Sequence, residues 1–127
     1  MKSVATVIIS SLVILFIDGT YLSVFGQPFI EQTAKIQNSS FKLNLHGAIF
    51  SYLFIIFALN YFVLLKTGSL FDAFILGLVT YGIYDMTNLA LFKQWDLSLA
   101  ILDTIWGGTL FTLTTFLTYW ILSILYP

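Results

Sequence analysis

Four long apolar segments alternate with short polar ones along the chain. Each is long enough to cross about 30 Å of hydrocarbon, which takes about 20 helical residues at 1.5 Å per residue. A backbone exposed to lipid must satisfy its own N–H and C=O groups, and these runs lack the strict alternation of barrel strands. The pattern predicts an all-α, integral membrane, antiparallel four-helix bundle and one transmembrane domain over residues 1–127. The expected spans are about 4–25, 43–65, 70–92 and 97–125.

The connections between these spans differ in length. Residues 26–42 form a polar segment that we expect to be a loop, whereas 66–69 and 93–96 are short enough to be tight turns. Short turns make neighbouring helices antiparallel, so we expect the second span to pack beside the third, and the third beside the fourth. An even number of spans places both termini on one side of the membrane. The few lysines on either side do not decide the orientation.

Composition restricts the class of protein further. The chain is 59% hydrophobic and 9% charged, with a mean hydropathy of +0.97, whereas a soluble surface needs roughly a quarter to a third charged residues. We therefore expect a multi-pass membrane protein whose partner is the lipid bilayer. A net charge of −1 without any arginine argues against nucleic-acid binding. The lack of cysteine removes disulfides and thiolate chemistry.

Three acids lie at one depth in the predicted bundle. Asp18 precedes the end of the first span by seven residues, Asp85 precedes the end of the third by six or seven, and Asp103 follows the start of the fourth by six. At 1.5 Å per residue, each lies about 9–10 Å below the same boundary. His46 is shallower on the same side. A carboxylate facing lipid at this depth would cost about 2.5–3.5 kcal/mol, so all three should turn inward.

Helical spacing places further polar side chains beside these acids. Tyr81, Tyr84, Asp85 and Asn88 recur every three or four residues and form one stripe on the third span. Trp106 forms a stripe with Asp103 on the fourth span, and we expect it to face the third span together with Gly107. The candidate site residues are Asp18, Tyr21, His46, Tyr81, Tyr84, Asp85, Asn88, Asp103 and Trp106.

Two interpretations of this polar cluster stay open. Hydrogen bonds among these groups can hold the helices together, each contributing on the order of 0.6–2 kcal/mol. Alternatively, closely spaced carboxyl groups away from water cannot all ionise, so that at least one keeps a proton and the cluster exchanges protons or binds a cation. We expect Asp85 to face the bundle interior, hydrogen-bonded within a cluster that includes Asp103, Asp18, Asn88 and a tyrosine hydroxyl. The acids and His46 do not follow a recognised metal-ligand spacing, so no metal or cofactor is expected.

A pair of motifs resembles a known family. "YGIYDMTNLALFKQW" is followed by "LDTIWGG", as in a family of small predicted membrane proteins classed as domain of unknown function 2177. The matching residues are Tyr84, Asp85, Thr87 and Asn88; Trp95; Asp103, Trp106 and Gly107; and, more loosely, Asp18 with Tyr21. The resemblance covers most of the chain and implies a four-helix fold with a shared polar site. It implies no activity and gives no role to His46.

Three functions compete for this chain. The first is transport, or another proton- or cation-linked role in the membrane, carried by the polar cluster. The second is a structural or partner-binding subunit, either in a homo-oligomer or in a larger membrane complex, which fits the small-residue helix faces. Third stands an intramembrane enzyme that modifies lipids, since buried acids can exchange protons. Nucleophile triads, zinc motifs and nucleotide-binding glycine loops do not occur, so no catalytic residue is assigned.

Overall fold

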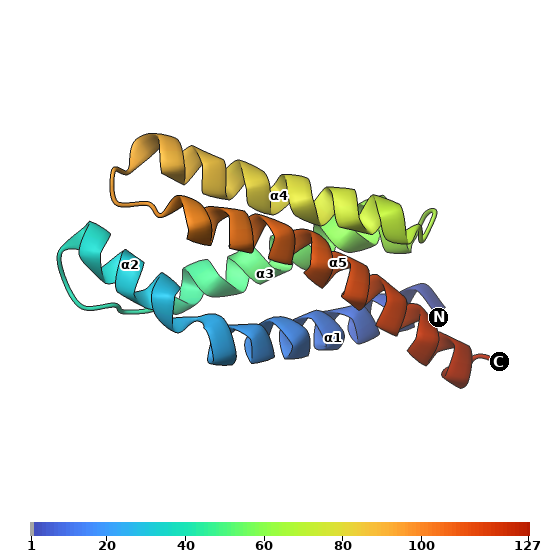
Figure 1. Cartoon of the computed structure of the whole chain (residues 1–127). Coiled ribbons are helices and arrows are strands. Elements are labelled where there is room, and N and C mark those ends of the chain that lie inside the picture. Colours follow the sequence, from blue (N-terminus) through green and yellow to red (C-terminus); the bar gives the residue numbers. More distant parts are fainter. Residues whose placement is uncertain (1) are drawn as a thin grey trace.

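The structure, a computed structural model, describes residues 2–127 and contains four helical stretches that are long and apolar enough to cross a membrane (Figure 1). The prediction of an all-α membrane bundle is confirmed. Both termini lie at the same end of the bundle, as an antiparallel four-span topology requires. The stretches are α1 (Lys2–Phe25), α3 (Leu45–Leu59) continued by the π-helix η1 (Asn60–Leu64), α4 (Leu70–Leu91) and α5 (Leu97–Leu125).

The polar segment after the first span is a helix, so the prediction of a loop over 26–42 is wrong there. Helix α2 occupies Gln27–Gln37 and has Pro28 in its first turn, where the missing N–H costs nothing. It ends at Asn38, which adopts a left-handed conformation with φ of 54° and is followed by a backbone bond from Ser39 to Ala34. These end signals are present in the sequence. However, an isolated helix of only eleven mostly polar residues is marginally stable, so these signals alone do not predict a helix here.

Helix α5 is the central element of the packing. It runs along α4 for most of its length and lies against α1 on another side (Figure 1). Glycines bring α4 and α5 together: a Cβ atom added to Gly107 would lie 2.6 Å from the carbonyl oxygen of Gly77, and one added to Gly108 would lie 2.8 Å from the Phe74 ring. Because glycine has no side chain, the backbones of α4 and α5 can approach each other closely at these positions.

Helix α3 makes its main contacts with α1 and hardly touches α4. We expected the second and third spans to pack side by side, and that expectation is wrong for most of their length. Its glycine, Gly47, lies in the exposed first turn, where an added Cβ would contact only the side chain of the N-cap residue Asn44, so α3 has no equivalent of the glycine contact that joins α4 to α5. Only the η1 end stays close to the start of α4, because a short turn at 65–69 connects them.

The apolar core lies on the terminal side of the three acids. Ile14, Leu59, Leu110 and Phe111 are fully or almost fully buried there. In η1 the backbone N–H of Leu65 donates to the carbonyl oxygen five residues earlier, which widens the turn. This turn directs Asn60 into the bundle, where its Nδ2 donates to Ser10 Oγ at 3.0 Å.

Candidate functional site

Asp18 joins three helices through its two carboxyl oxygens. Its side chain on α1 is 6% exposed. The Tyr52 hydroxyl, from α3, donates to Oδ2, and the indole Nε1 of Trp106, from α5, donates to Oδ1 at 2.9 Å. Both oxygens therefore have a donor, and the energetic cost of burying this carboxyl group is offset by directed hydrogen bonds.

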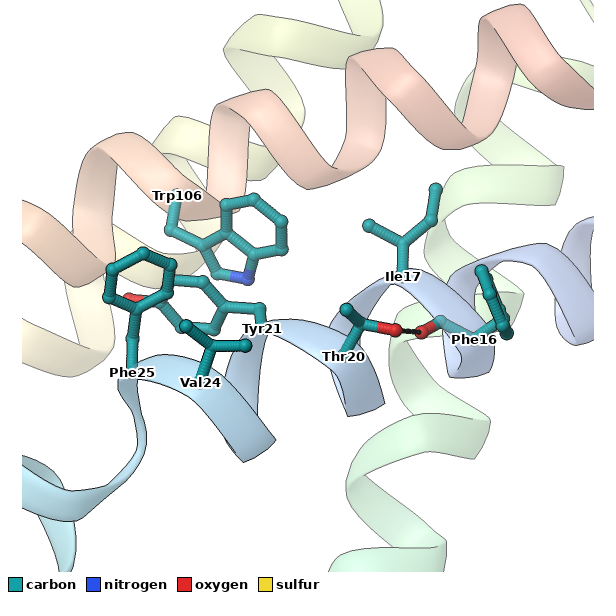
Figure 2. A pocket seen from close by; sticks show the side chains of 7 residues that line it. All are labelled: Phe16, Ile17, Thr20, Tyr21, Val24, Phe25 and Trp106. Carbon is teal, nitrogen blue, oxygen red and sulfur yellow. Dashed lines mark hydrogen bonds between the residues drawn. The ribbon is translucent and has the colours of Figure 1, made fainter.

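Tyr21 covers this arrangement from the outside. Its ring stacks on Trp106 with 4.1 Å between centroids and 7° between planes, and Figure 2 shows the two side chains lying face to face between α1 and α5. They border an apolar groove of about 290 Å³ that Phe16 and Val24 also line. The stacked pair thus closes the Asp18 site against the surroundings of the bundle.

Asp85 and Asp103 form a second group in the same layer. Asp85, on α4, is 1% exposed, and its carboxyl group lies beside that of Asp103 on α5. Oδ2 of Asp85 has no hydrogen-bond partner among the described residues. The indole N–H of Trp95 lies near this carboxyl group without the geometry of a hydrogen bond. Two acids are therefore side by side with one buried oxygen unsatisfied.

Basic groups are remote from this carboxyl pair. All five lysines are exposed and lie at helix ends or in the connections, and the chain has no arginine. His46, which we expected near the acids, is exposed in the first turn of α3. The carboxyl pair therefore lacks a cationic side chain that could balance two negative charges.

A cavity of about 340 Å³ reaches Asp103 from the side of the bundle. It lies where α3 diverges from α4, and Asp103 is the one acid in its wall. Phe54 and Tyr84 are 73% and 58% exposed, so the cavity is open at these side chains. Its lining residues are Ser51, Phe54, Ile55, Thr80, Tyr81, Tyr84 and Asp103. Small-molecule binding sites are commonly cavities of this kind, mostly apolar with a few polar groups.

The sequence of this chain matches a known protein family. The model of the predicted membrane proteins called DUF2177 matches residues 3–120. The chain belongs to this family. Comparisons with curated proteins and with solved structures gave no match. Membership of DUF2177 confirms the resemblance and the multi-pass membrane location, and with them a lipid bilayer as the environment of the helices.

The residues of the predicted stripe on α4 do not all face the same surroundings in the structure of this DUF2177 member. Asp85 is buried, and Tyr81 is half-buried with its ring edge-on to that of Phe111 on α5, at 6.2 Å between ring centroids. Tyr84 instead lies at the cavity rim, with its ring edge-on to that of Trp95 at 5.9 Å between ring centroids. The half-buried Asn88 lies near the Tyr84 hydroxyl.

Trp106 and Gly107 face different helices, although we expected both against the third span. Gly107 does face α4, since a Cβ atom there would lie 2.6 Å from the carbonyl oxygen of Gly77. Trp106 faces α1, where it bonds to Asp18. Adjacent helical residues differ in direction by about 100°, so both side chains cannot point at the same neighbour.

The sequence reasoning missed two residues that organise this end of the bundle. Tyr52 donates to Asp18, and the signal for it was its depth, nine residues into the predicted second span. Gln32 of α2 is 6% exposed, and its Oε1 accepts the backbone N–H of Asp96 at 2.6 Å, just before α5 begins. Asp96 itself caps α5 through Oδ1 and the N–H of Leu99 at 3.0 Å.

The three acids do not form a metal centre in the described part of the chain, where no three side chains of the metal-binding types come together. The layer therefore contains one carboxyl group with both oxygens satisfied, Asp18, and a pair without complete partners, Asp85 and Asp103. The first is suited to holding helices in position. The second is suited to exchanging a proton or meeting a cation.

Proposed function

We propose that this protein carries out proton- or cation-linked transport and that the carboxyl pair Asp85–Asp103 is its exchanging group. One observation carries the proposal: two carboxyl groups lie side by side at intramembrane depth, one of them 1% exposed, with all lysines exposed at the ends. Ionisable residues at such positions commonly mark proton or ion pathways.

Electrostatics supports the proton as the first partner of this pair. Two unit negative charges about 4 Å apart repel by about 4 kcal/mol at an effective dielectric constant near 20. A single proton shared by the two groups removes this repulsion and supplies the donor that Oδ2 of Asp85 lacks. The pair then has two states, one with the proton and one in which another cation replaces it.

The remaining groups have supporting roles in this proposal. Asp18 is saturated by Tyr52 and Trp106, so it holds α1, α3 and α5 together around the exchanging pair. Asp103 lines the open cavity, which supports it as the member of the pair that meets a substrate or ion. Asp85, deeper and almost fully buried, is the member that keeps the proton.

Proton uptake into proteoliposomes tests the proposal. A pH-sensitive dye inside the vesicles reports the uptake when valinomycin imposes a potassium diffusion potential. We expect a rate above that of protein-free vesicles, lost in Asp85→Asn and in Asp103→Asn because a carboxamide does not carry an exchangeable acidic proton. Asp72→Asn is the matched control, because Asp72 is an exposed acid in the first turn of α4.

Equal uptake by the wild type and both pair variants would contradict the proposal. That result, with all variants folded, would favour the structural or partner-binding subunit instead. Circular dichroism and the elution volume in detergent establish that each variant is folded before reconstitution.

A further inference from the structure

We infer that the cavity beside Asp103 binds a lipophilic organic cation, an amine with an aromatic or aliphatic body, which enters sideways from the bilayer. This inference rests on the proposed function and names its substrate class. It follows from the chemistry of the cavity wall, the unpartnered carboxyl oxygen behind it and the separation of α3 from α4.

The wall of the cavity combines one carboxyl group with three aromatic rings. Asp103 supplies the countercharge, and Phe54, Tyr81 and Tyr84 surround the space in front of it. Aromatic faces attract cations, and they do so more strongly away from water. Ile55 adds an apolar surface for a hydrocarbon body. A hydrated metal ion would gain little from such a wall, whereas an alkylated ammonium group can contact both rings and carboxylate.

Behind Asp103 the site has a second carboxyl group that is not satisfied. Oδ2 of Asp85 has no partner among residues 2–127, and the side chain is 1% exposed. A cation held at Asp103 therefore contacts one carboxyl group and lies next to a second, and its arrival favours release of the shared proton. One positive charge enters and one leaves, so the net charge of the layer is unchanged by the exchange.

The other titratable groups that face this pair do not supply a competing cation. Among the described residues they come from α1 and α4, and all are acids or phenols. These groups are Asp18, Tyr21, Tyr81 and Tyr84. A bound organic cation would thus be the positive charge closest to the carboxyl pair.

Access and size agree with this ligand class. Because α3 hardly touches α4, the cavity opens between these helices, with the exposed side chains of Phe54 and Tyr84 at the opening. In a membrane this opening faces lipid, where lipophilic cations concentrate. A volume of about 340 Å³ is at the lower end of the ligand-pocket range of about 300–1,000 Å³, which suits a small amine.

The test is calorimetric binding of benzyltrimethylammonium to the full chain in lipid nanodiscs, with empty nanodiscs subtracted. Neopentylbenzene is the neutral probe of the same shape, in which carbon replaces the quaternary nitrogen. We expect the cation to bind at least about tenfold more tightly than the neutral probe, a difference of about 1.4 kcal/mol. Repeating the titration in two buffers of different ionisation enthalpy should reveal release of about one proton per cation bound.

Variants then locate the binding. Asp103→Asn should weaken cation binding by about tenfold or more and abolish the proton release, because it removes the countercharge. Asp72→Asn should leave both unchanged. Equal affinity for the charged and neutral probes on the wild type would overturn the inference, and this comparison does not depend on any variant folding.

Failure of this inference can be separated from failure of the proposed function. Proton uptake that depends on Asp85 and Asp103, together with no preference for the charged probe, would overturn the substrate class alone. Absence of both would overturn the inference and the proposed function together.

Discussion

The bundle has two buried polar layers, and they differ in charge. The layer toward the loops contains Asp18, Asp85 and Asp103, whereas the layer toward the termini contains Ser10, Asn60 and neutral threonines of α5. Buried apolar residues of the core, Ile14, Leu110 and Phe111 among them, separate the two.

The neutral layer joins helices without introducing charge. Asn60 Nδ2 donates to Ser10 Oγ at 3.0 Å and to the carbonyl oxygen of Ile56 at 2.9 Å, and Thr115 Oγ1 donates to the carbonyl oxygen of Phe111 at 2.8 Å. These bonds satisfy the Asn60 amide and the Thr115 hydroxyl in a single protonation state, although Asn60 Oδ1, Thr114 Oγ1 and Thr118 Oγ1 are buried without a partner among the described residues. In the proposed function, the carboxyl pair in the other layer carries a proton or a cation, because two adjacent carboxylates repel one another. The contrast is that one interhelical hydrogen bond between neutral groups joins α1 to η1 in this layer, whereas the function proposed for the carboxyl layer depends on protons.

Within the carboxyl layer, Asp18 should have the largest effect on stability. Asp18→Ala leaves the Tyr52 hydroxyl and the Trp106 indole N–H without their acceptor, at about 1–3 kcal/mol each, so we expect a loss of about 2–6 kcal/mol. Asp18→Asn retains an acceptor oxygen and should lose less. Thermal unfolding in detergent measures both. A melting temperature of Asp18→Ala equal to that of the wild type would contradict the role of Asp18 in holding three helices together.

Counting along antiparallel helices is enough to predict that the three acids share one depth, and in the structure Asp18 and Asp85 both lie near Asp103. Hydropathy likewise defined the four spans to within two residues at most boundaries. Spacing within one helix also sufficed to place Asp85 on the buried face of α4. These properties are local, and each depends on the rise and rotation per residue of a single helix.

The partners of these acids could not be predicted in the same way. Which neighbour a side chain meets depends on how each helix is rotated and how closely two helices approach. Trp106 was assigned to the wrong neighbour for this reason, and Tyr52 was missed. The separation of α3 from α4, which creates the cavity at Asp103, also depends on where the glycines lie relative to other helices.

The glycine contact between α4 and α5 should have the next largest effect on stability. Gly107→Ala places a methyl group 2.6 Å from the carbonyl oxygen of Gly77, a backbone atom that cannot move aside, so we expect a loss of about 1–3 kcal/mol. Gly19→Ala is the matched control, because its added Cβ would have no atom within 4 Å apart from its chain neighbours and the backbone of its own helix. Equal melting curves for the two variants would argue against close packing of α4 on α5.

A smaller effect is expected in the neutral layer. Asn60→Ala and Ser10→Ala, combined in a double-mutant cycle, should give a coupling energy of about 0.6–2 kcal/mol, the usual range for a hydrogen bond between membrane helices. Proton uptake by both variants should match the wild type once they are folded. Loss of uptake in Asn60→Ala would remove the distinction between the two layers.

The smallest change in stability is expected for Asp85→Asn. A carboxamide can replace a protonated carboxyl group in size and in hydrogen bonding, so the unfolding free energy should change by less than about 1 kcal/mol. The same variant should lose proton uptake. Strong destabilisation by Asp85→Asn, with Asp72→Asn unaffected, would instead assign the carboxyl pair a role in holding α4 against α5.

The central claim, that Asp85 and Asp103 share a proton, is tested most directly by infrared spectroscopy of the reconstituted protein, in which the spectra of variants are subtracted from that of the wild type. Spectra of the wild type at neutral pH should contain a C=O stretching band from a protonated carboxyl group, which shifts in deuterium oxide. The account predicts that this band is lost or displaced in both Asp85→Asn and Asp103→Asn and is retained in Asp72→Asn. A band that is absent from the wild type, or is the same in all three variants, would contradict the shared proton.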